Sequence, residues 1–309
     1  MMKTLLMLLL TVVAATGALA CCMVPVSYKG SIGQDAQEAV LIHDGDREEL
    51  VLRINYRIQG DKMPDTFVWV ITTPKEPDAY AVADPLLFKD MFDLAQALVV
   101  PVKKGSWRSA KTDSPEAAGV ELGKRVQVGP YDIQPVRGVG PHALTGLNAW
   151  LKDNGFPTEA PDHMTYFVQN DFTFLCVRVT APEKSTSVES TGMLPPLHLS
   201  FETPVPYYPL RFSSRQGVFD VNLHVLTRAK LDYMKSAATL TKLNWSSKSY
   251  KQNVKLPEKR MPATLKAVFS KSAWKDDVNT WRYNNIRCSR VNSKHPISDW
   301  KEDVFLSLK

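Results

Sequence analysis

The sequence predicts an α+β fold dominated by antiparallel β-sheet. Two observations predict this class: segments that alternate apolar and polar residues outnumber helical segments, and turn signals of the hairpin type join them. Hydrophobic residues make up 44% of the chain and charged residues 23%, which are the proportions of a globular protein and exclude a polytopic membrane protein. No repeat of fixed period is visible, which disfavours a solenoid.

Residues 39–43 and 50–58 form the first predicted strand pair. Asp44 and Gly45 lie in their connection, and this dipeptide readily adopts the positive φ angles of a tight hairpin. Every second residue of 50–58 is apolar, and the intervening positions include Arg53. We therefore expect an antiparallel pair with one buried face and one face in solvent.

The following elements alternate between strands and two helices. A first helix is expected to start at Asp84 and Pro85, because Asp caps a helix and Pro loses no hydrogen bond in the first turn. A second helix is bounded by Pro141 and Gly155, where Gly155 is suited to a left-handed cap. The remaining predictions are a central strand over 66–72, a loop over 101–119, a polar connector over 182–196, and strands over 125–128, 131–133, 165–168, 172–180, 197–201 and 219–225.

Residues 1–20 have the pattern of a cleavable signal peptide. Lys3 precedes a short apolar run, and the small residues Ala18 and Ala20 end it. This pattern predicts cleavage between Ala20 and Cys21 and export to the periplasm or the extracellular space. An uncleaved membrane anchor is disfavoured, because small and polar residues interrupt the apolar run before it ends.

Two kinds of signal peptidase are compatible with cleavage before Cys21. Ala20 before Cys21 also fits a lipoprotein signal, in which the cysteine receives a diacylglyceryl group that attaches the protein to a membrane. Leu19 is bulkier than the small residue usual at the second position before that cut. Ordinary secretion is therefore favoured, with lipid attachment as the alternative.

Four cysteines remain in the mature chain, and an oxidising compartment permits them to form disulfides. They are Cys21, Cys22, Cys176 and Cys288. A bond between the adjacent pair is strained, so a link from that pair to one of the two distant cysteines is favoured. The spacings lack the paired cysteines of zinc sites, and no metal or other cofactor is predicted.

The C-terminal region, residues 244–309, differs from the sheet-rich main domain predicted over 21–243. From Leu240 to the end the chain has 15 lysine and arginine residues against six aspartate and glutamate residues. We expect its tryptophans to pack on the main domain and its lysines to be solvated; contact with an anionic partner is the alternative, and export disfavours nucleic acid. These tryptophans are Trp245, Trp274, Trp281 and Trp300.

No catalytic motif is present in the sequence, and the histidines are isolated candidates for acid–base chemistry. His198 and His224 lie on the polar side of alternating strands, and we expect both to be surface residues. A cleft that brought either one within hydrogen-bond reach of a Ser, Asp or Cys would instead support an exported hydrolase.

Several short segments resemble domain-of-unknown-function family 2330, a family of bacterial proteins. They are residues 33–41, 56–61, 70–74, 147–156, 208–211 and 299–305. The resemblance implies a secreted or envelope protein and supplies no catalytic residues. The sequence therefore predicts a non-enzymatic envelope protein that binds another envelope protein or a polymer. The alternatives are an exported hydrolase and a lipid-anchored accessory subunit.

Overall fold

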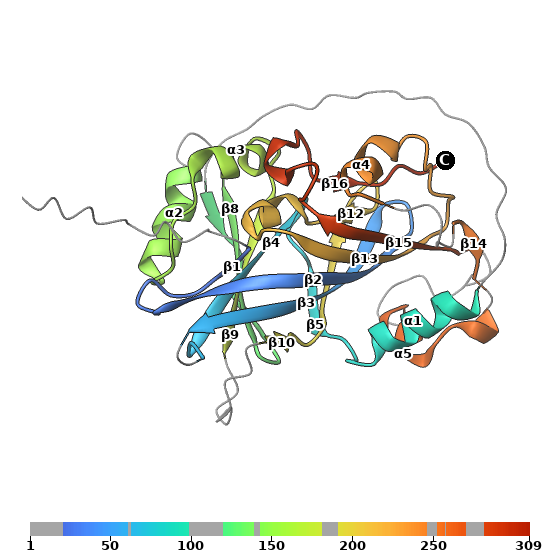
Figure 1. The fold of residues 1–309 in the computed structure, drawn as a ribbon, viewed down its shortest axis with the longest axis horizontal. Coiled ribbons are helices and arrows are strands. Elements are labelled where there is room, and N and C mark those ends of the chain that lie inside the picture. Colours follow the sequence, from blue (N-terminus) through green and yellow to red (C-terminus); the bar gives the residue numbers. More distant parts are fainter. Residues whose placement is uncertain are drawn as a thin grey trace, which may run out of the picture.

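Two β-sheets pack face to face, with helices at both ends of the molecule (Figure 1). The computed structural model describes residues 21–60, 63–98, 120–138, 143–180, 191–245, 252–256, 258–269 and 281–309. The predicted α+β class with mostly antiparallel sheet is confirmed. The predicted signal peptide with Ala20, the loop over 101–119, most of the polar connector and Trp274 lie outside the described residues.

The larger sheet has eight strands, and only the β13–β2 pair is parallel. Its order is β14 (Val254–Lys255), β15 (Arg282–Val291), β13 (Phe219–Thr227), β2 (Gly30–His43), β3 (Arg47–Gly60), β11 (Leu197–Glu202) and β5 (Ala79–Val82), and β10 (Thr191–Met193) also pairs with β3. The long strands β2 and β3 form its centre.

The smaller sheet has six strands, all antiparallel. Its order is β1 (Cys22–Met23), β4 (Thr66–Thr73), β9 (Thr173–Thr180), β8 (Tyr131–Gly138) and β6 (Val120–Leu122), and β7 (Val126–Val128) also pairs with β8. A separate pair joins β12 (Tyr207–Tyr208) to β16 (Val304–Phe305).

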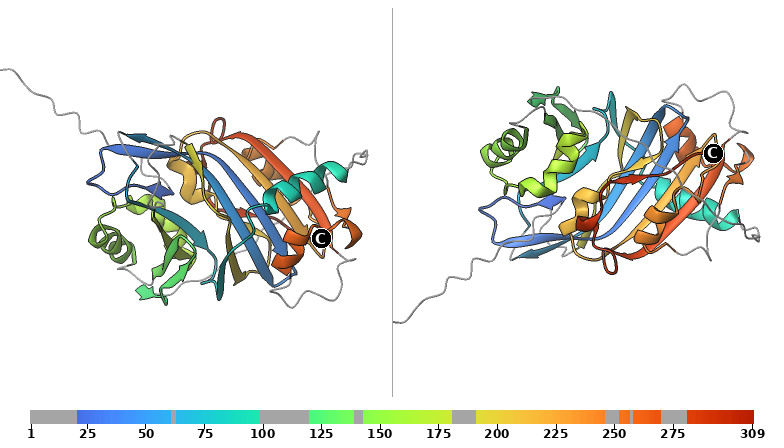
Figure 2. Two further views of the ribbon diagram at one scale, coloured as in Figure 1. Left: turned by 90° about the horizontal axis from the view of Figure 1, so that it is seen from below. Right: turned by 90° about the horizontal axis from the view of Figure 1, so that it is seen from above.

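Helices lie beside both sheets (Figure 2). They are α1 (Leu87–Ala97), α2 (Ala143–Asp153), α3 (Pro161–Gln169), α4 (Ala237–Lys242) and α5 (Ala263–Phe269), with the 3-10 turns η1 (Arg211–Arg215), η3 (Glu258–Arg260) and η5 (Ile297–Asp299). The first helix begins at Leu87, later than the predicted start at Asp84 and Pro85, and its N-cap residue Leu86 has no side-chain cap; Asp84 accepts from Leu86 N at 2.8 Å in the preceding turn. As expected, Gly155 follows the end of the second helix with φ +78°.

The predicted hairpin at Asp44 and Gly45 is present. The Asp44 carboxylate accepts hydrogen bonds from the backbone N–H groups of Asp46 (3.1 Å) and Arg47 (2.9 Å), and Gly45 has φ +129°. A side-chain acceptor at the first turn position and a glycine at positive φ are the local causes of this reversal.

Both faces of the larger sheet are buried at its centre, which differs from the prediction of one solvated face. Leu50 and Leu52 of β3 point toward the smaller sheet, whereas Val51 lies in a second apolar cluster with α1 and α5. The Arg53 guanidinium lies 4.4 Å from the centre of the Phe88 ring of α1. Helices α1 and α5 therefore cover the face of the larger sheet that the alternation of apolar and polar residues in 50–58 predicts to be in solvent.

The segment 165–168 belongs to helix α3, so the predicted strand there is wrong. Pro161 occupies the first turn, where a missing N–H costs nothing, and Met164 and Phe167 bury one side of the helix. A short run of aromatic and β-branched residues is compatible with either element, and packing on the Phe172 and Phe212 rings selected the helix.

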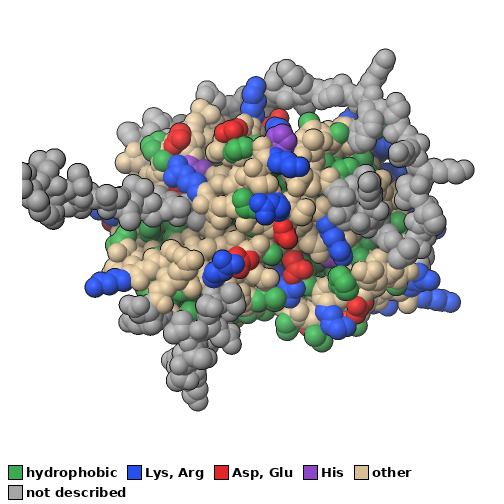
Figure 3. All heavy atoms as spheres, in the orientation of Figure 1, with side chains coloured by type: hydrophobic (Ala, Val, Ile, Leu, Met, Phe, Trp, Pro, Cys, Tyr) green, Lys and Arg blue, Asp and Glu red, His purple; other side chains and the backbone are tan. Residues whose placement is uncertain are grey.

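The C-terminal region is part of the larger sheet. β15 pairs with β13 along its length, and β14 extends the same sheet. Trp281 and Trp300 are buried. On the face shown in Figure 3, basic and acidic side chains are interspersed.

Glu48 supplies a pH-dependent prediction. This β3 carboxyl is fully buried, accepts a hydrogen bond from Tyr207 N at 2.8 Å, and burial raises its pKa well above the ordinary value. Because the folded-state pKa exceeds the unfolded one, its contribution to stability falls as the pH rises above the ordinary glutamate value.

We expect Glu48→Gln to raise the free energy of unfolding by about 1 kcal/mol near neutral pH, because Gln keeps the acceptor and cannot ionise. Urea unfolding at about pH 4 and about pH 7 measures this. The gain over wild type should be larger at the higher pH; an equal or reversed gain would contradict the prediction.

Candidate functional site

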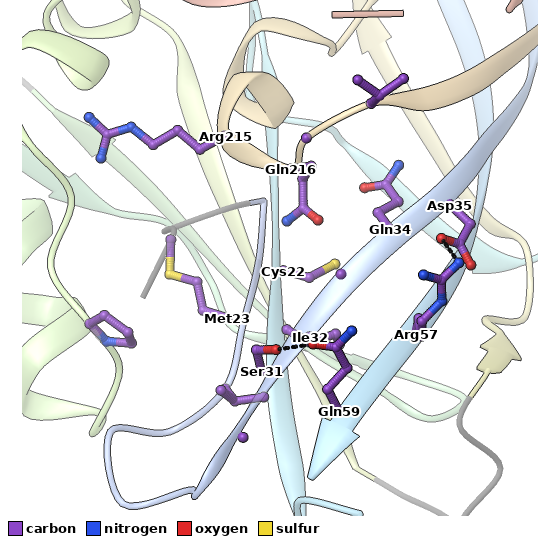
Figure 4. Close-up of a pocket in the computed structure, with 16 residues that line it drawn as sticks. Cys22, Met23, Ser31, Ile32, Gln34, Asp35, Arg57, Gln59, Arg215 and Gln216 are labelled. Carbon is purple, nitrogen blue, oxygen red and sulfur yellow. Dashed lines mark hydrogen bonds and ion pairs between the residues drawn. The ribbon is translucent and has the colours of Figure 1, made fainter. Parts of the chain in front are cut away.

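A cavity of about 510 Å³ lies where the start of the predicted mature chain meets β2 (Figure 4). Residues 22–24 form one part of its lining, and residues 30–35 of β2 with neighbouring side chains of β3 form another. The third part is the loop 215–218, which connects η1 to β13. The lining therefore joins the start of the described chain to residues of β3, Pro157 and the segment 215–218, which lie far from it in sequence.

The loop 215–218 is held in place by two polar side chains, the partly buried Asn292 and the buried Asp303. Asn292 Nδ2 donates to the carbonyls of Ser214 and Gly217, both at 2.8 Å. Asp303 accepts from the N–H groups of Leu210 (3.0 Å) and Arg211 (2.9 Å), at the start of η1. This side of the cavity is therefore anchored by residues from the C-terminal region.

One edge of β2 is unpaired among the described residues. β2 pairs with β3 from Gly30 onward, but β13 joins its other edge only from Ala36 onward. Residues 30–35 thus have one strand neighbour, and they line the cavity. An unpaired strand edge presents backbone N–H and C=O groups to whatever lies beside it.

Two glutamine side chains of the cavity lining have unsatisfied amide atoms. Gln34 is 3% exposed, and its Nε2 has no hydrogen-bond partner among the described residues. Both amide atoms of Gln216 are also buried without a partner in the described part of the chain. A buried amide without a partner costs about 1 to 3 kcal/mol, so such groups mark a place where a polar ligand adds stability.

The charged groups of the cavity lining are two arginines and one aspartate. Arg57 Nη2 lies 2.6 Å from the Asp35 carboxylate, and both side chains are partly exposed. Arg215 Nη1 lies 3.5 Å from the buried carboxylate of Glu159. Each arginine is therefore paired with a carboxylate, and Arg57 is the more exposed of the two.

Cys21 and Cys22 lie beside the cavity and are buried. The Cys21 thiol donates to Gln34 Oε1 at 2.9 Å, and the Cys21 carbonyl accepts from Val70 N at 2.6 Å. Burial and the neighbouring Cys21 thiol raise the pKa of Cys22 well above its ordinary value. The Cys22 thiol is therefore protonated and weakly nucleophilic in the folded protein.

The four cysteines are free thiols in this structure, and all are buried. Cys22 faces Trp69 across the β1–β4 pair, whereas Cys176 faces Val70 across the β4–β9 pair. Adjacent residues of β4 point to opposite sides, so Cys22 and Cys176 lie on opposite faces of the smaller sheet. Burial raises the pKa of Cys288 to about 12. The predicted disulfide is not formed here.

His198 and His224 are both buried, so the expectation that they lie on the surface is wrong. The helices α1 and α5 cover the sheet face from which they project. His198 hydrogen-bonds Glu49, and His224 Nδ1 lies 2.7 Å from the Tyr283 hydroxyl. Burial lowers the pKa of His224 to about 3. Within the described ranges, neither histidine hydrogen-bonds the Ser, Asp or Cys that a hydrolytic site was expected to require.

A histidine that the sequence reasoning missed does contact a serine. His163 Nδ1 donates to Glu159 Oε2 at 2.8 Å, and His163 Nε2 accepts from Ser214 Oγ at 3.2 Å. The order of contacts is that of a nucleophile, a base and a carboxylate that orients the base. All three side chains are buried, and none of them lines the cavity. Glu159 and His163 are four residues apart. This spacing indicates a side-chain contact only in a helical conformation, which the sequence did not predict for this segment.

Among the described residues, no group of three or more histidine, cysteine, aspartate or glutamate side chains is arranged to hold a metal ion. No described helix is long and apolar enough to cross a membrane. What the arrangement offers is a cavity with an open strand edge, unsatisfied amides and a few charges.

No curated protein matches the chain. Among solved structures, the chain is similar to the crystal structure of baculovirus P35, at 10% sequence identity and a TM-score of 0.39, covering 92% of this chain and 99% of that one. A family model described as "Uncharacterized protein conserved in bacteria (DUF2330)" matches residues 14–277. The match confirms the family inferred from the short segments, of which 299–305 lies outside the matched range. The chain belongs to this bacterial family, DUF2330.

Proposed function

We propose that the protein is exported to the cell envelope and acts as a non-enzymatic binding protein, with its ligand in the cavity beside Cys22. The observation that carries the proposal is the pair of buried glutamine amides, Gln34 and Gln216, that lack partners among the described residues and line this cavity. A ligand with hydrogen-bond donors and acceptors would satisfy them.

Export is supported by the signal pattern of residues 1–20. Cleavage after Ala20 leaves every described residue in the mature chain, including Cys21, whose carbonyl and thiol both hydrogen-bond within the fold.

Burial of Cys21 supports ordinary secretion over lipid attachment. A diacylglyceryl group on the Cys21 sulfur must extend away from the protein surface to insert into a membrane. The Cys21 side chain, however, is 2% exposed, and its thiol donates a hydrogen bond to Gln34. Acylation would remove this hydrogen bond and force the chain start out of the core. The lipid-anchored accessory subunit is therefore the disfavoured alternative.

We expect the intact mass of the protein recovered from its host to match a chain that starts at Cys21 without an acyl group. The same measurement after alkylation in denaturant counts the thiols, and four are expected from this structure. A chain that retains Met1 would contradict export. An acylated N-terminus would contradict secretion without an anchor.

Binding is tested on the same material by native mass spectrometry. The wild type from the envelope fraction should carry an additional noncovalent mass that denaturation removes. The double variant Gln34→Leu, Gln216→Leu should carry it at no more than about a tenth of the occupancy. Gln127→Leu, at an exposed position of β7, is the matched control. Equal spectra from wild type and double variant would contradict the proposal.

A second candidate is an exported hydrolase, favoured by the contacts among Ser214, His163 and Glu159. In this function Ser214 would attack an ester or amide carbonyl while His163 takes its proton. The alternative role is structural, in which the same contacts hold α3 against η1 and His163 stacks on Phe212 at 4.7 Å.

A fluorophosphonate probe separates the two roles, because it labels only an activated serine. Labelling that is lost in both Ser214→Ala and His163→Ala, and kept in Ser213→Ala, would establish the hydrolase. We expect no labelling above the Ser214→Ala background, in agreement with the binding protein.

A further inference from the structure

We propose that the ligand of this cavity is an extended, acidic segment of a partner protein, which adds as a strand to the unpaired edge of β2 at residues 30–35. The inference rests on the proposed function and names its ligand class.

The position that the segment would occupy is the one that β13 leaves empty. β13 runs parallel to β2 and starts its pairing at Asp220, opposite Ala36. The loop 215–218 turns away from the sheet before this point and lines the cavity instead. Residues 30–35 span about 20 Å of strand, enough to pair with a segment of about six residues.

A peptide is the polymer whose donors and acceptors match this edge. Its N–H and C=O groups alternate at the spacing of a β-strand, as do the free groups of β2. Gln34 offers an unused donor, and Gln216 offers both a donor and an acceptor; both side chains lie along the cavity in Figure 4. A side-chain amide and a peptide group form complementary hydrogen bonds, so one bound strand can satisfy the edge and the amides together.

Small residues let another backbone approach β2 closely. Gly30, Ser31 and Gly33 lie in this stretch and line the cavity. A Cβ atom at Gly33 would meet only the Arg57 carbonyl, at 3.9 Å, so a side chain fits there without strain. Gly33 is thus not required for the local fold, and the open space beside it favours an incoming backbone.

Charge selects an acidic segment over a basic one. Arg57 and Arg215 line the cavity with Asp35 as the acidic residue of the lining. The Arg57 side chain is 51% exposed, so it remains accessible beside its ion pair. A carboxylate on the segment gains a contact with the exposed Arg57 guanidinium, and a lysine at the same place is repelled by it.

The probe is a blocked peptide of about eight residues that alternates valine and threonine around one central glutamate. We expect saturable binding to the full mature protein by fluorescence anisotropy. Lysine in place of the glutamate should weaken binding at least about tenfold. N-methylation of alternate residues on one edge of the peptide should abolish binding, whereas methylation on its other edge should be tolerated.

Variants of the protein locate the site. Gln34→Leu and Gly33→Leu should each weaken peptide binding at least about tenfold, and Gln127→Leu should leave it unchanged. Circular dichroism and thermal melting check that each variant folds.

Hydrogen exchange gives a readout independent of affinity. Backbone amides in residues 30–35 should gain protection from exchange when the peptide binds. Amides in residues 37–43 already have two strand neighbours, so their protection should not change.

Three results would overturn the inference. The first is no binding of the peptide. The second is binding without protection of residues 30–35. The third is protection of this edge by a cell-wall glycan, or by a second copy of the chain seen as a dimer in size-exclusion chromatography. If the native mass spectra still show a ligand that depends on Gln34 and Gln216, the proposed function stands and only the peptide class fails.

Discussion

Replacing Asp303 by alanine is expected to lower the free energy of unfolding by about 3 to 5 kcal/mol and the melting temperature by roughly 10 °C. The Asp303 carboxyl is almost fully buried and accepts from three backbone N–H groups and from the Tyr207 hydroxyl at 2.8 Å. Alanine leaves the N–H groups of Leu210 and Arg211 buried without an acceptor, so the cost includes their desolvation.

Replacing Asp303 by alanine is also expected to disturb the lining of the cavity. Leu210 and Arg211 begin η1, which leads directly into the loop with Gln216. We expect Asp303→Ala also to lose the bound mass or peptide under conditions where the protein is still folded.

Two variants serve as controls for Asp303→Ala. Asp303→Asn keeps the oxygen that serves Leu210 and Arg211 and should cost only about 1 kcal/mol. Asp299→Ala, at an exposed position four residues earlier, should be near neutral. Urea unfolding measures all three, and a loss below about 1 kcal/mol for Asp303→Ala would contradict the role given to this carboxyl.

Replacing Trp281 by alanine is expected to cost about 3 to 5 kcal/mol. The side chain is 0% exposed and packs edge-to-face on Phe269 with the ring centres 5.1 Å apart. The Arg228 guanidinium lies 5.5 Å from the ring centre, and the Trp281 carbonyl accepts from Leu256 N at 3.0 Å. Removing the indole leaves a cavity between the larger sheet and α5.

This second variant tests whether the basic C-terminal region is integral to the fold. We expect the whole structure of the variant to unfold cooperatively at a lower urea concentration than wild type, because Trp281 precedes β15, which pairs along β13. Val26→Ala, where the side chain is 72% exposed, is the control. If Trp281→Ala unfolded only the C-terminal residues and left the remaining transition unchanged, the region would be a separate unit.

Local signals in the sequence were sufficient for several elements. The hairpin at Asp44 and Gly45 follows from an acceptor side chain and a glycine within one turn, and Asp84 and Pro85 form the turn that leads into the first helix. These interactions join residues within a few positions of each other, so the sequence alone contains them. The class of the fold, antiparallel sheet with a few helices, follows from the same periodicities.

The sequence misled where burial depends on distant segments. Val51, His198 and His224 alternate with apolar neighbours as surface residues do, but helices from elsewhere cover them. The helix α3 was missed because its aromatic run also fits a strand, and with it His163 was missed. Periodicity reports which side chains share a face, not what packs on that face.

The sequence by itself determined the signal pattern, the hairpin, the end of the second helix at Gly155 and the family to which the chain belongs. The tertiary structure alone decided that β13 stops short of residues 30–35, that the loop with Gln216 closes the space beside them, and that the Cys21 thiol points into the core. These features join residues that lie far apart along the chain. Their geometry depends on how the two sheets pack, and no local pattern of residues encodes that packing.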